Sequence, residues 1–166
     1  MLVTQEPVLR RFWYPVMPIA QLTAGPQAFT LLGQPLVLWL SETGQPAALA
    51  DRCCHRSARL SMGIVQQGCV RCPYHGWSFN SAGVCTKVPQ LAPEAALPKT
   101  YRVPSYLCRE RYGYAWVCLS SEPLLPLPEI PEADVTAHRL IPQFYEPWNC
   151  SGLRVMENSF DNAHFS

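Results

Sequence analysis

Two cysteine–histidine pairs constrain the fold of this chain more than any other feature of its sequence. Cys53-Cys54-His55 is followed, after 16 residues, by Cys72-Pro73-Tyr74-His75, which gives the pattern C-x-H…C-x-x-H. Four side chains that bind one metal centre must be held at fixed positions, so two loops separated in sequence have to meet on a rigid support. This requirement favours a scaffold of β-strands.

The order of the ligands distinguishes two kinds of metal site. In a two-iron cluster of Rieske type, two His replace two Cys on one iron, and the potential rises from about −400 mV to between about −150 and +300 mV. Zinc also accepts two Cys and two His, but zinc fingers group Cys with Cys and His with His. We therefore predict a [2Fe–2S] cluster that passes single electrons, with a structural zinc domain as the alternative. The predicted ligands are Cys53, His55, Cys72 and His75.

The rest of the chain is typical of a mainly β protein. The 166 residues include 17 Pro, which disfavour long helices, and 48% hydrophobic residues, which indicate a folded core. Short apolar runs separated by Gly and Pro turns predict an antiparallel meander and a later hairpin. The predicted strands are 29–32, 36–40, 47–50, 68–71, 77–79, 84–87, 106–110 and 114–118.

A proline-dense stretch at 122–131 predicts a domain boundary, because such sequences are extended and fairly stiff. We expect one domain over residues 10–122, and a linker with the beginning of a second domain over 123–166. Residues 152–165 contain no Pro and form the best candidate for a helix. The chain stops at Ser166 with no helix-ending signal, so we expect the second domain to be truncated.

Charge and composition limit the kinds of binding partner and the cell compartment that this chain can have. The net charge of +1 does not suggest a nucleic-acid partner, and no apolar run approaches the length of a membrane span. The first residues lack the basic and apolar regions of a secretory signal. Eight cysteines in a chain of this length and kind point to metal binding and free thiols in a reducing compartment, so we expect a cytoplasmic protein.

Two segments, Asp51–Ser61 and Cys72–Phe79, closely resemble the Rieske domain of Rieske non-haem iron oxygenases, and Phe12–Val16 resembles the entry strand of that family. The resemblance implies an antiparallel Rieske β-sandwich, followed by the first segment of a truncated α+β catalytic domain. Cys54 departs from the family, which more often has Pro there. Tyr74 and Trp77 are expected to pack around the cluster and shield it from water.

A second motif, Glu157-x-x-x-Asp161-x-x-His164, is weak by itself but resembles the start of the catalytic domain in that family. The resemblance implies that His164 is the first ligand of a non-haem Fe(II) with open positions for O₂ and substrate. Asp161 resembles the acid that bridges a cluster histidine of one subunit to an iron histidine of its neighbour. The remaining iron ligands would lie beyond Ser166. His138 has no partner at ligand spacing and is expected to be an ordinary surface histidine.

The leading hypothesis is thus the oxygenase component of a Rieske system. It would take electrons from a ferredoxin or flavin-dependent reductase and pass them to the iron, which activates O₂ for mono- or dioxygenation of a small organic substrate. The resemblance also implies a homotrimer, and the wording of residues 157–164 is most like cyanobacterial and plastid-related members. The alternative is a Rieske-type ferredoxin that only carries electrons, although such a carrier needs nothing after about residue 123.

Overall fold

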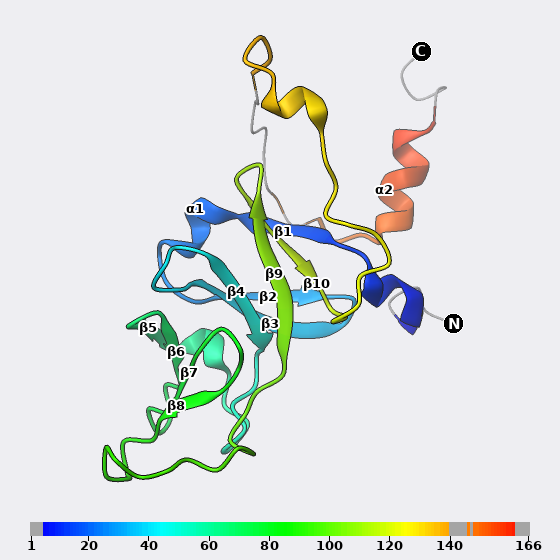
Figure 1. Ribbon diagram of the computed structural model, residues 1–166. Coiled ribbons are helices and arrows are strands. Elements are labelled where there is room, and N and C mark those ends of the chain that lie inside the picture. The colour runs from blue at the N-terminus through cyan, green and yellow to red at the C-terminus, as the bar shows by residue number, and fades with distance from the viewer. Residues whose placement is uncertain (1–4, 140–145, 147, 162–166) are drawn as a thin grey trace.

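The computed structural model describes residues 5–139, 146 and 148–161, and in them a six-stranded antiparallel sheet is the largest element (Figure 1). Its strand order is β1-β10-β9-β4-β3-β2. The strand bounds are β1 (Tyr14–Pro18), β2 (Gln27–Leu31), β3 (Gln34–Leu40), β4 (Pro46–Ala50), β9 (Ser105–Arg111) and β10 (Tyr114–Cys118).

A smaller sheet of four short strands, in the order β5-β6-β7-β8, is inserted between β4 and β9. Its strands are β5 (Ile64–Gln66), β6 (Cys69–Arg71), β7 (Ser78–Phe79) and β8 (Cys85–Lys87). The helices of the described residues are short, as the abundant Pro predicts. They are η2 (Pro7–Arg11), α1 (Ile19–Leu22), η3 (Leu60–Met62), η4 (Pro131–Asp134) and α2 (Gly152–Ser159). The prediction of a mainly β, antiparallel fold is confirmed.

Tight two-residue turns build the hairpins of the large sheet. Leu32 and Gly33, between β2 and β3, have φ values of 48° and 76°, as a type I′ hairpin turn requires. Tyr112 and Gly113, between β9 and β10, repeat this arrangement with φ values of 55° and 76°. The predicted meander and hairpin are therefore present; β10 has the predicted bounds, and the other four strands are one or two residues longer than the apolar runs indicate.

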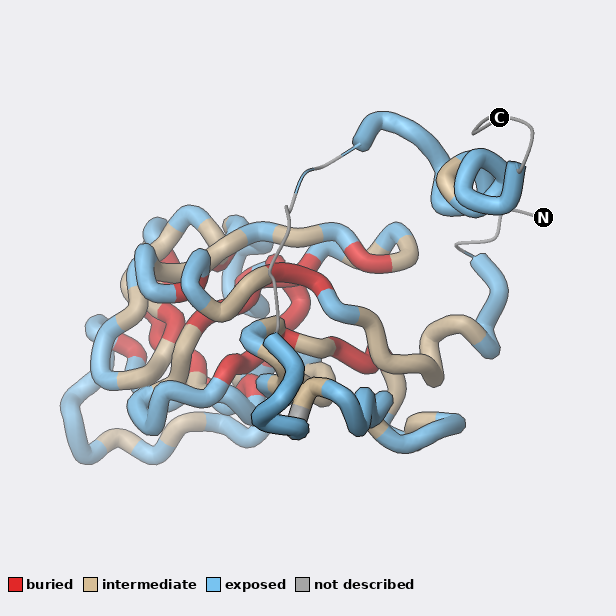
Figure 2. The backbone as a smooth tube through the Cα atoms, turned by 90° about the horizontal axis from the view of Figure 1, so that it is seen from above, coloured by how far each residue is buried: buried red, intermediate tan, exposed pale blue. Residues whose placement is uncertain are grey.

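Strand β3 is buried on both faces and separates two parts of the core. Val37 and Trp39 belong to a cluster shared with Phe79 of the small sheet. Leu36 and Leu38, the alternate residues, belong to a second cluster, because successive side chains of a strand point to opposite faces. That second cluster includes residues from both edge strands, β1 and β2, so the large sheet curves around it. The small sheet covers the other face through the cluster that contains Val70 and Phe79. Figure 2 shows the buried residues concentrated in the interior of the β-structure.

The small sheet makes two close approaches, one to β3 and one within the sheet itself. The indole Nε1 of Trp39, in β3, donates a hydrogen bond to Gly68 O at 2.9 Å. Gly63 lies so close to β6 that a Cβ at this position would be 1.9 Å from Arg71 O, which only glycine can avoid. Strand β5, which follows Gly63 directly, was not among the predicted strands.

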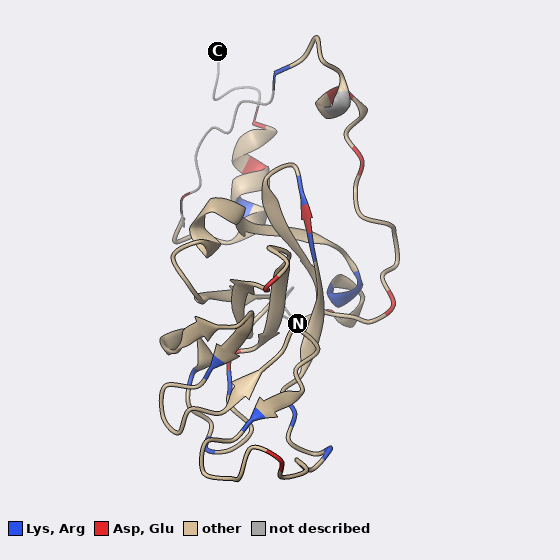
Figure 3. Cartoon of the chain, turned by 60° about the vertical axis from the view of Figure 1, so that its left-hand side comes forward, with Lys and Arg blue, Asp and Glu red and all other residues tan. Residues whose placement is uncertain are grey.

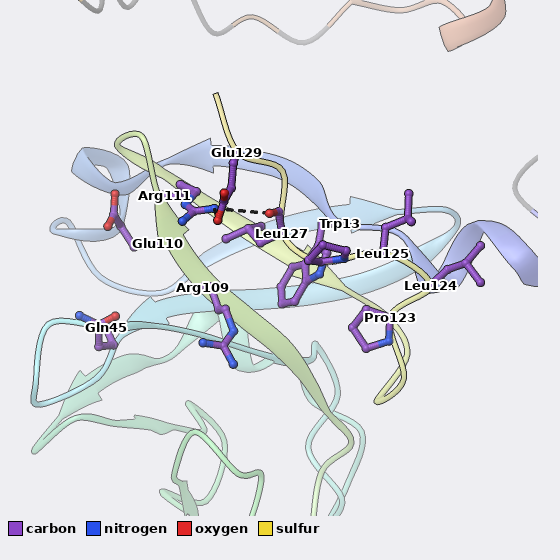
Figure 4. Close-up of a pocket in the computed structure, with 11 residues that line it drawn as sticks. Trp13, Gln45, Arg109, Glu110, Arg111, Pro123, Leu124, Leu125, Leu127 and Glu129 are labelled. Atoms are coloured by element: carbon purple, nitrogen blue, oxygen red, sulfur yellow. Dashed lines mark hydrogen bonds and ion pairs between the residues drawn. The ribbon is translucent and has the colours of Figure 1, made fainter. Parts of the chain in front are cut away.

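The proline-rich segment, residues 122–131, lies along the β9–β10 hairpin. Arg111 Nη1 donates to Leu127 O at 3.4 Å, and Tyr112 Oη accepts a hydrogen bond from Ile130 N at 2.7 Å. Figure 4 shows Arg111 directed at Leu127 and Glu129 from the neighbouring strand. The segment is therefore attached to the β-structure at several points. The division into domains at residues 122 and 123 stays a prediction.

Helix α2 (Gly152–Ser159) is shorter than the helix predicted over residues 152–165. Ser151 caps its first turn through the side-chain oxygen. Ser159 Oγ donates to Val155 O at 2.8 Å, and the helix ends at this residue. The prediction of helix through Asp161 is therefore wrong, and residues 162–165 lie outside the described part of the chain. No residue of α2 is buried.

Candidate metal centre

Loop 1, residues 53–58, follows β4 and carries the first cysteine–histidine pair. Cys53 N donates to Ala58 O at 2.8 Å, and Ser57 N donates to Cys53 O at 2.9 Å. Ser57 has a φ of 59°, which residues other than glycine seldom adopt. Its Oγ accepts a hydrogen bond from Arg52 Nε at 2.9 Å. These contacts close the neck of the loop and leave His55 exposed at its tip.

Loop 2, residues 72–77, joins β6 to β7 and has the same backbone construction. Cys72 N donates to Trp77 O at 2.8 Å, and Gly76 N donates to Cys72 O at 3.1 Å. Gly76, with a φ of 75°, takes the place that Ser57 has in loop 1. The two loops are thus equivalent in backbone although their sequences differ. The histidine is the third residue of loop 1 and the fourth residue of loop 2.

A buried carboxylate anchors the entry to loop 1. Asp51 is 8% exposed, and its two oxygens accept hydrogen bonds from Ser61 N at 2.7 Å and Ser61 Oγ at 2.6 Å. Asp51 N in turn donates to Pro35 O at 3.1 Å. The residues before and after loop 1 are therefore joined to each other and to β3. The sequence prediction included Asp51 only as part of a resembling segment and assigned it no role.

The four candidate ligand side chains are brought together by these loops. Cys53 and Cys72 are each 3% exposed and belong to the core cluster between the sheets. The His55 and His75 rings lie at the surface end, with centroids 4.7 Å apart and an angle of 57° between their planes. Two thiols therefore face inward and two imidazoles lie near solvent.

Burial and neighbouring groups change the proton affinities at the site. Burial, with the adjacent Cys72 thiol, raises the pKa of Cys53 to about 12. Desolvation, His75 and Arg56 lower the pKa of His55. A neutral imidazole is the form that binds metal, whereas a thiol must lose its proton when metal binds. The lowered pKa keeps His55 in its ligating form at neutral pH.

The arrangement fits a two-iron centre better than a single metal ion. The candidate ligands form one pair of thiols and one pair of imidazoles, as a Rieske cluster requires. A zinc ion would need all four around one point.

Comparison with known proteins identifies the family. Residues 12–107 match the Rieske [2Fe–2S] domain family. This chain belongs to that family. The residues present fit its cluster, since the Rieske domain here offers two buried thiols and two solvent-facing imidazoles on matching loops.

Relatives of this Rieske domain are Rieske non-haem iron oxygenases. Aminopyrrolnitrin oxygenase of Pseudomonas fluorescens is 36% identical over 161 residues, which cover 92% of this chain and 44% of the relative. The solved structure of the demethylase NdmA from Pseudomonas putida superposes with a TM-score of 0.86 at 34% identity, over 98% of this chain and 51% of that one. The chain thus spans about half the length of these relatives.

The expected likeness to plastid-related oxygenases is supported. Chlorophyllide a oxygenase of Chlamydomonas reinhardtii is 42% identical over 113 residues, covering 68% of this chain and 17% of the relative. The bacterial relatives align over more of the chain, including the segment after the Rieske domain. Within the described residues, no helix has the length and apolar character needed to cross a bilayer.

Aromatic rings support the histidines of the Rieske domain. Trp77 is 7% exposed and stacks on His55, with centroids 4.5 Å apart and planes 6° from parallel, and Tyr101 packs behind it at 4.6 Å. The prediction that Trp77 is a packing residue is confirmed. Tyr74 is 65% exposed, and its ring packs beside that of His75, with centroids 3.8 Å apart. Its expected role in shielding the cluster from water stays a prediction.

Gln90 was missed by sequence reasoning. Its Nε2 donates to His75 O at 2.9 Å and ties loop 2 to the segment after β8. An isolated Gln in a proline-rich, largely apolar stretch carries no pattern that would have indicated this role. Tyr101 was missed for the same reason, because its contact with Trp77 depends on how the chain returns to the large sheet.

The second motif stands apart from these loops. Asp161 follows α2 and is exposed, and within the described residues it joins no metal-binding group with the Cys and His side chains. His164 lies outside the described residues. The roles inferred for both stay predictions. His138 is exposed, as expected of a surface histidine.

Proposed function

We propose that Cys53, His55, Cys72 and His75 hold a [2Fe–2S] cluster, and that the protein is the oxygenase component of a Rieske system. Such a cluster, with two thiolate and two imidazole ligands, takes up and releases one electron at a time. The proposal is carried by the two loops of matching construction, which bring two buried thiols and two solvent-facing imidazoles together.

The surrounding residues would keep this site rigid and directional. Buried Cys53 and Cys72 exclude water from the inner side, while the exposed His55 offers an electron a short route to the surface. Trp77 fixes the plane of the His55 ring by stacking, and Gln90 restrains loop 2. A ligand set held in place before and after a change of charge needs little rearrangement, which favours fast electron exchange.

In the complete protein, the electrons would be used at a non-haem Fe(II) that activates O₂ for mono- or dioxygenation of an organic substrate. His164 would be its first ligand, and Asp161 the outer carboxylate that orients a histidine. A ferredoxin or flavin-dependent reductase would donate the electrons, and the assembly would be a homotrimer. The oxygenase relatives align over 92% and 98% of the chain, beyond residue 123, which favours this function over that of an electron carrier alone.

We also propose that residues 10–122 form the Rieske domain, that residues 123–166 begin the catalytic part, and that the protein works in the cytoplasm. The first proposal is supported by the family match over residues 12–107 and by the proline-rich segment that follows β10. The last is supported by the eight cysteines, none of which forms a disulfide, as is usual in a reducing compartment.

The cluster assignment is tested by metal content and spectra of anaerobically purified protein. We expect iron and acid-labile sulfide in equal amounts, a red-brown colour, and a Rieske electron paramagnetic resonance signal after reduction. Cys72→Ser and His75→Ala should each abolish the visible absorption, whereas Cys54→Ser, which changes an exposed neighbouring thiol, should keep it. Zinc without sulfide, or a full spectrum in the Cys72→Ser variant, would refute the proposal.

The iron-site assignment needs a protein that includes the sequence after Ser166. There, His164→Ala should lower the iron content and abolish oxygenation while the Rieske signal stays at its normal intensity. His138→Ala is the matched control and should leave both unchanged. If the His164→Ala protein keeps its full iron content, the proposed ligand is wrong although the cluster assignment stands.

A further inference from the structure

A cleft lies between the small sheet and the loop that follows β8. The loop consists of residues 88–97, and the cleft has a volume of about 640 Å³. Sites for small molecules in proteins usually measure about 300 to 1,000 Å³. None of the four candidate cluster ligands lines this cleft, so it is separate from the metal centre.

The covering loop is held against the sheet at several points. Val88, at its start, is 7% exposed and belongs to the same core cluster as Phe79, and Leu97, at its end, packs against that cluster. Between them, Gln90 Nε2 donates to His75 O at 2.9 Å. The cleft is therefore formed in advance, and a ligand would enter it without the entropy cost of ordering a loop.

Ser78 places a buried hydroxyl group in this cleft. It is 8% exposed and lines the cleft, and its neighbour Phe79 points into the core, so the Ser78 side chain points to the opposite face of the sheet. Within the described part of the chain, Ser78 Oγ forms no hydrogen bond, because the bond from Thr86 Oγ1 goes to the backbone oxygen of Ser78. A buried hydroxyl group normally has a partner, so we expect a molecule in the cleft to supply one.

Lys87 supplies a positive charge beside this hydroxyl group. Lys87 and Ser78 are register partners on the adjacent strands β8 and β7, so their side chains can reach the same ligand. Lys87 is exposed and has no ion pair with any residue that the structure describes. No Asp or Glu is among the lining residues. The polar side of the cleft therefore favours a negatively charged group.

The charge of the surrounding region favours an anion as well. Residues 51–103 contain seven Lys and Arg but only two Asp and Glu, so their net charge is +5. Figure 3 shows Lys and Arg gathered at the end of the molecule that holds the small sheet. Of the two acids, Asp51 is buried and bonded to Ser61, and Glu94 is exposed on the covering loop without lining the cleft. A positive field of this kind attracts anionic ligands.

The other side of the cleft is apolar. It is formed by aliphatic side chains and prolines of the covering loop, and an apolar wall with a few placed polar groups is typical of a small-molecule site. A ligand with an acidic end and an apolar body would match both sides. The apolar lining residues are Val88, Pro89, Leu91, Ala92, Pro93, Ala95 and Leu97.

We propose that this cleft, between the small sheet and residues 88–97, binds a small amphipathic organic acid. Lys87 contacts the carboxylate, Ser78 Oγ donates a hydrogen bond to one of its oxygens, and the aliphatic wall holds the apolar body. The site lies in the Rieske domain and is distinct from the substrate position at the proposed Fe(II).

The test is isothermal titration calorimetry of the cluster-loaded protein, with phenylbutyrate as the probe and phenylbutanamide as its neutral counterpart. The acid should bind, and the amide should bind about tenfold more weakly, because it lacks the charge-assisted contact with Lys87. Lys87→Gln should weaken binding of the acid by about tenfold and leave binding of the amide unchanged. Ser78→Ala should weaken both several-fold. Lys99→Gln, at an exposed lysine outside the cleft, is the matched control and should bind like wild type.

Cys69 provides an independent test of the location, because it also lines the cleft. Saturating phenylbutyrate should slow the alkylation of Cys69 by iodoacetamide, as measured by mass spectrometry of the resulting peptides. Cys150, an exposed thiol outside the cleft, should react at an unchanged rate.

Equal affinities for the acid and the amide, or full affinity for the acid in Lys87→Gln, would overturn the proposal. Binding that leaves the alkylation of Cys69 unchanged would overturn it too. If neither probe binds up to its solubility limit, water alone fills the cleft and the proposal fails. None of these measurements uses the cluster signal, so a missing Rieske signal would refute the proposed function and leave the cleft proposal standing.

Discussion

At the scale of single residues, Asp51 is the side chain on which loop 1 most depends. Its two oxygens accept both hydrogen bonds from Ser61 in a site that is 8% exposed, so the loop closes onto a buried charge. Removing a partner from a buried hydrogen bond costs more than the bond contributes, because the other group stays unsatisfied. The hydrogen bonds of Asp51 therefore both stabilise the folded state and fix the position of loop 1, which carries two of the candidate ligands.

We expect Asp51→Ala to lower the free energy of unfolding by about 3 kcal/mol, since it leaves Ser61 N and Oγ without an acceptor. Ser61→Ala removes one of the two bonds and should cost only about 1 kcal/mol. Guanidinium unfolding of the cluster-loaded protein under anaerobic conditions measures both. Equal losses of unfolding free energy in the two variants would show that the hydrogen bond from Ser61 N, which only Asp51→Ala removes, contributes nothing to stability.

Cys108 predicts a loss of stability at alkaline pH. It packs against the second core cluster, and burial raises the pKa of its thiol from 9.0 to about 12. Between these values the unfolded chain has released the proton while the folded chain retains it. Stability should therefore be full below pH 9 and should fall, as the pH rises toward about 12, by up to about 1.4 kcal/mol per pH unit from this group.

The measurement compares urea unfolding of wild type and Cys108→Ala between about pH 8 and pH 11. The variant should lose less stability with rising pH, and Cys150→Ser, at an exposed thiol, should behave like wild type. Parallel profiles of wild type and Cys108→Ala would contradict the assignment.

At the scale of elements, the proline-rich segment is attached to the hairpin by specific contacts. Tyr112 Oη accepts from Ile130 N at 2.7 Å, and this bond joins residues that the chain separates by the whole of β10. The ion pair Arg111–Glu129 is exposed and contributes little. The hydroxyl of Tyr112 is thus expected to be the principal tie at this end of the segment.

Tyr112→Phe should release this end of the segment, because the Ile130 amide then loses its acceptor. Hydrogen exchange of residues 122–131 should become several-fold faster, equivalent to about 1 kcal/mol of protection. Tyr114→Phe, two residues further along the hairpin, is the matched control and should not change the rate. Unchanged exchange in Tyr112→Phe would mean that other contacts hold the segment.

The sequence predicts some elements better than others for physical reasons. Strands flanked by Gly turns, such as 36–40 and 114–118, could be predicted because a continuous apolar run beside a turn with φ > 0 positions leaves a local signature. Strand β5 has three residues and depends on pairing with β6. The end of α2 could not be predicted, because the hydrogen bond from Ser159 to Val155 is compatible with either continuing or ending the helix.

The candidate site shows the same division between local and tertiary information. The four candidate ligands could be predicted from the sequence, because a metal centre requires Cys and His at a characteristic spacing. The matching necks of loops 1 and 2 are not, since Ser57 and Gly76 share a backbone conformation but no residue type. Gln90 and Tyr101 reach the site through tertiary contacts alone.

At the scale of the whole molecule, the candidate cluster site lies between two sheets, one with six longer strands and one with four short strands. Loop 1 leaves β4 of the six-stranded sheet, whereas loop 2 belongs to a sheet whose strands have two or three residues. The small sheet is also joined to the large one by the core cluster that includes Cys53 and Cys72. A group bound by both loops would therefore connect the two sheets, and its binding free energy would add to the stability of the folded state.

Removing the cluster should consequently loosen the small sheet first. After anaerobic extraction of iron and sulfide, amides of β6 and β7 should lose hydrogen-exchange protection, while the meander β2–β4 keeps most of its own, because its strands are longer and β3 is buried on both faces. The His75→Ala variant should show the same pattern without extraction. Equal loss of protection in both sheets would mean that the molecule unfolds as one unit, and that the ligand loops contribute no more to the small sheet than to the large one.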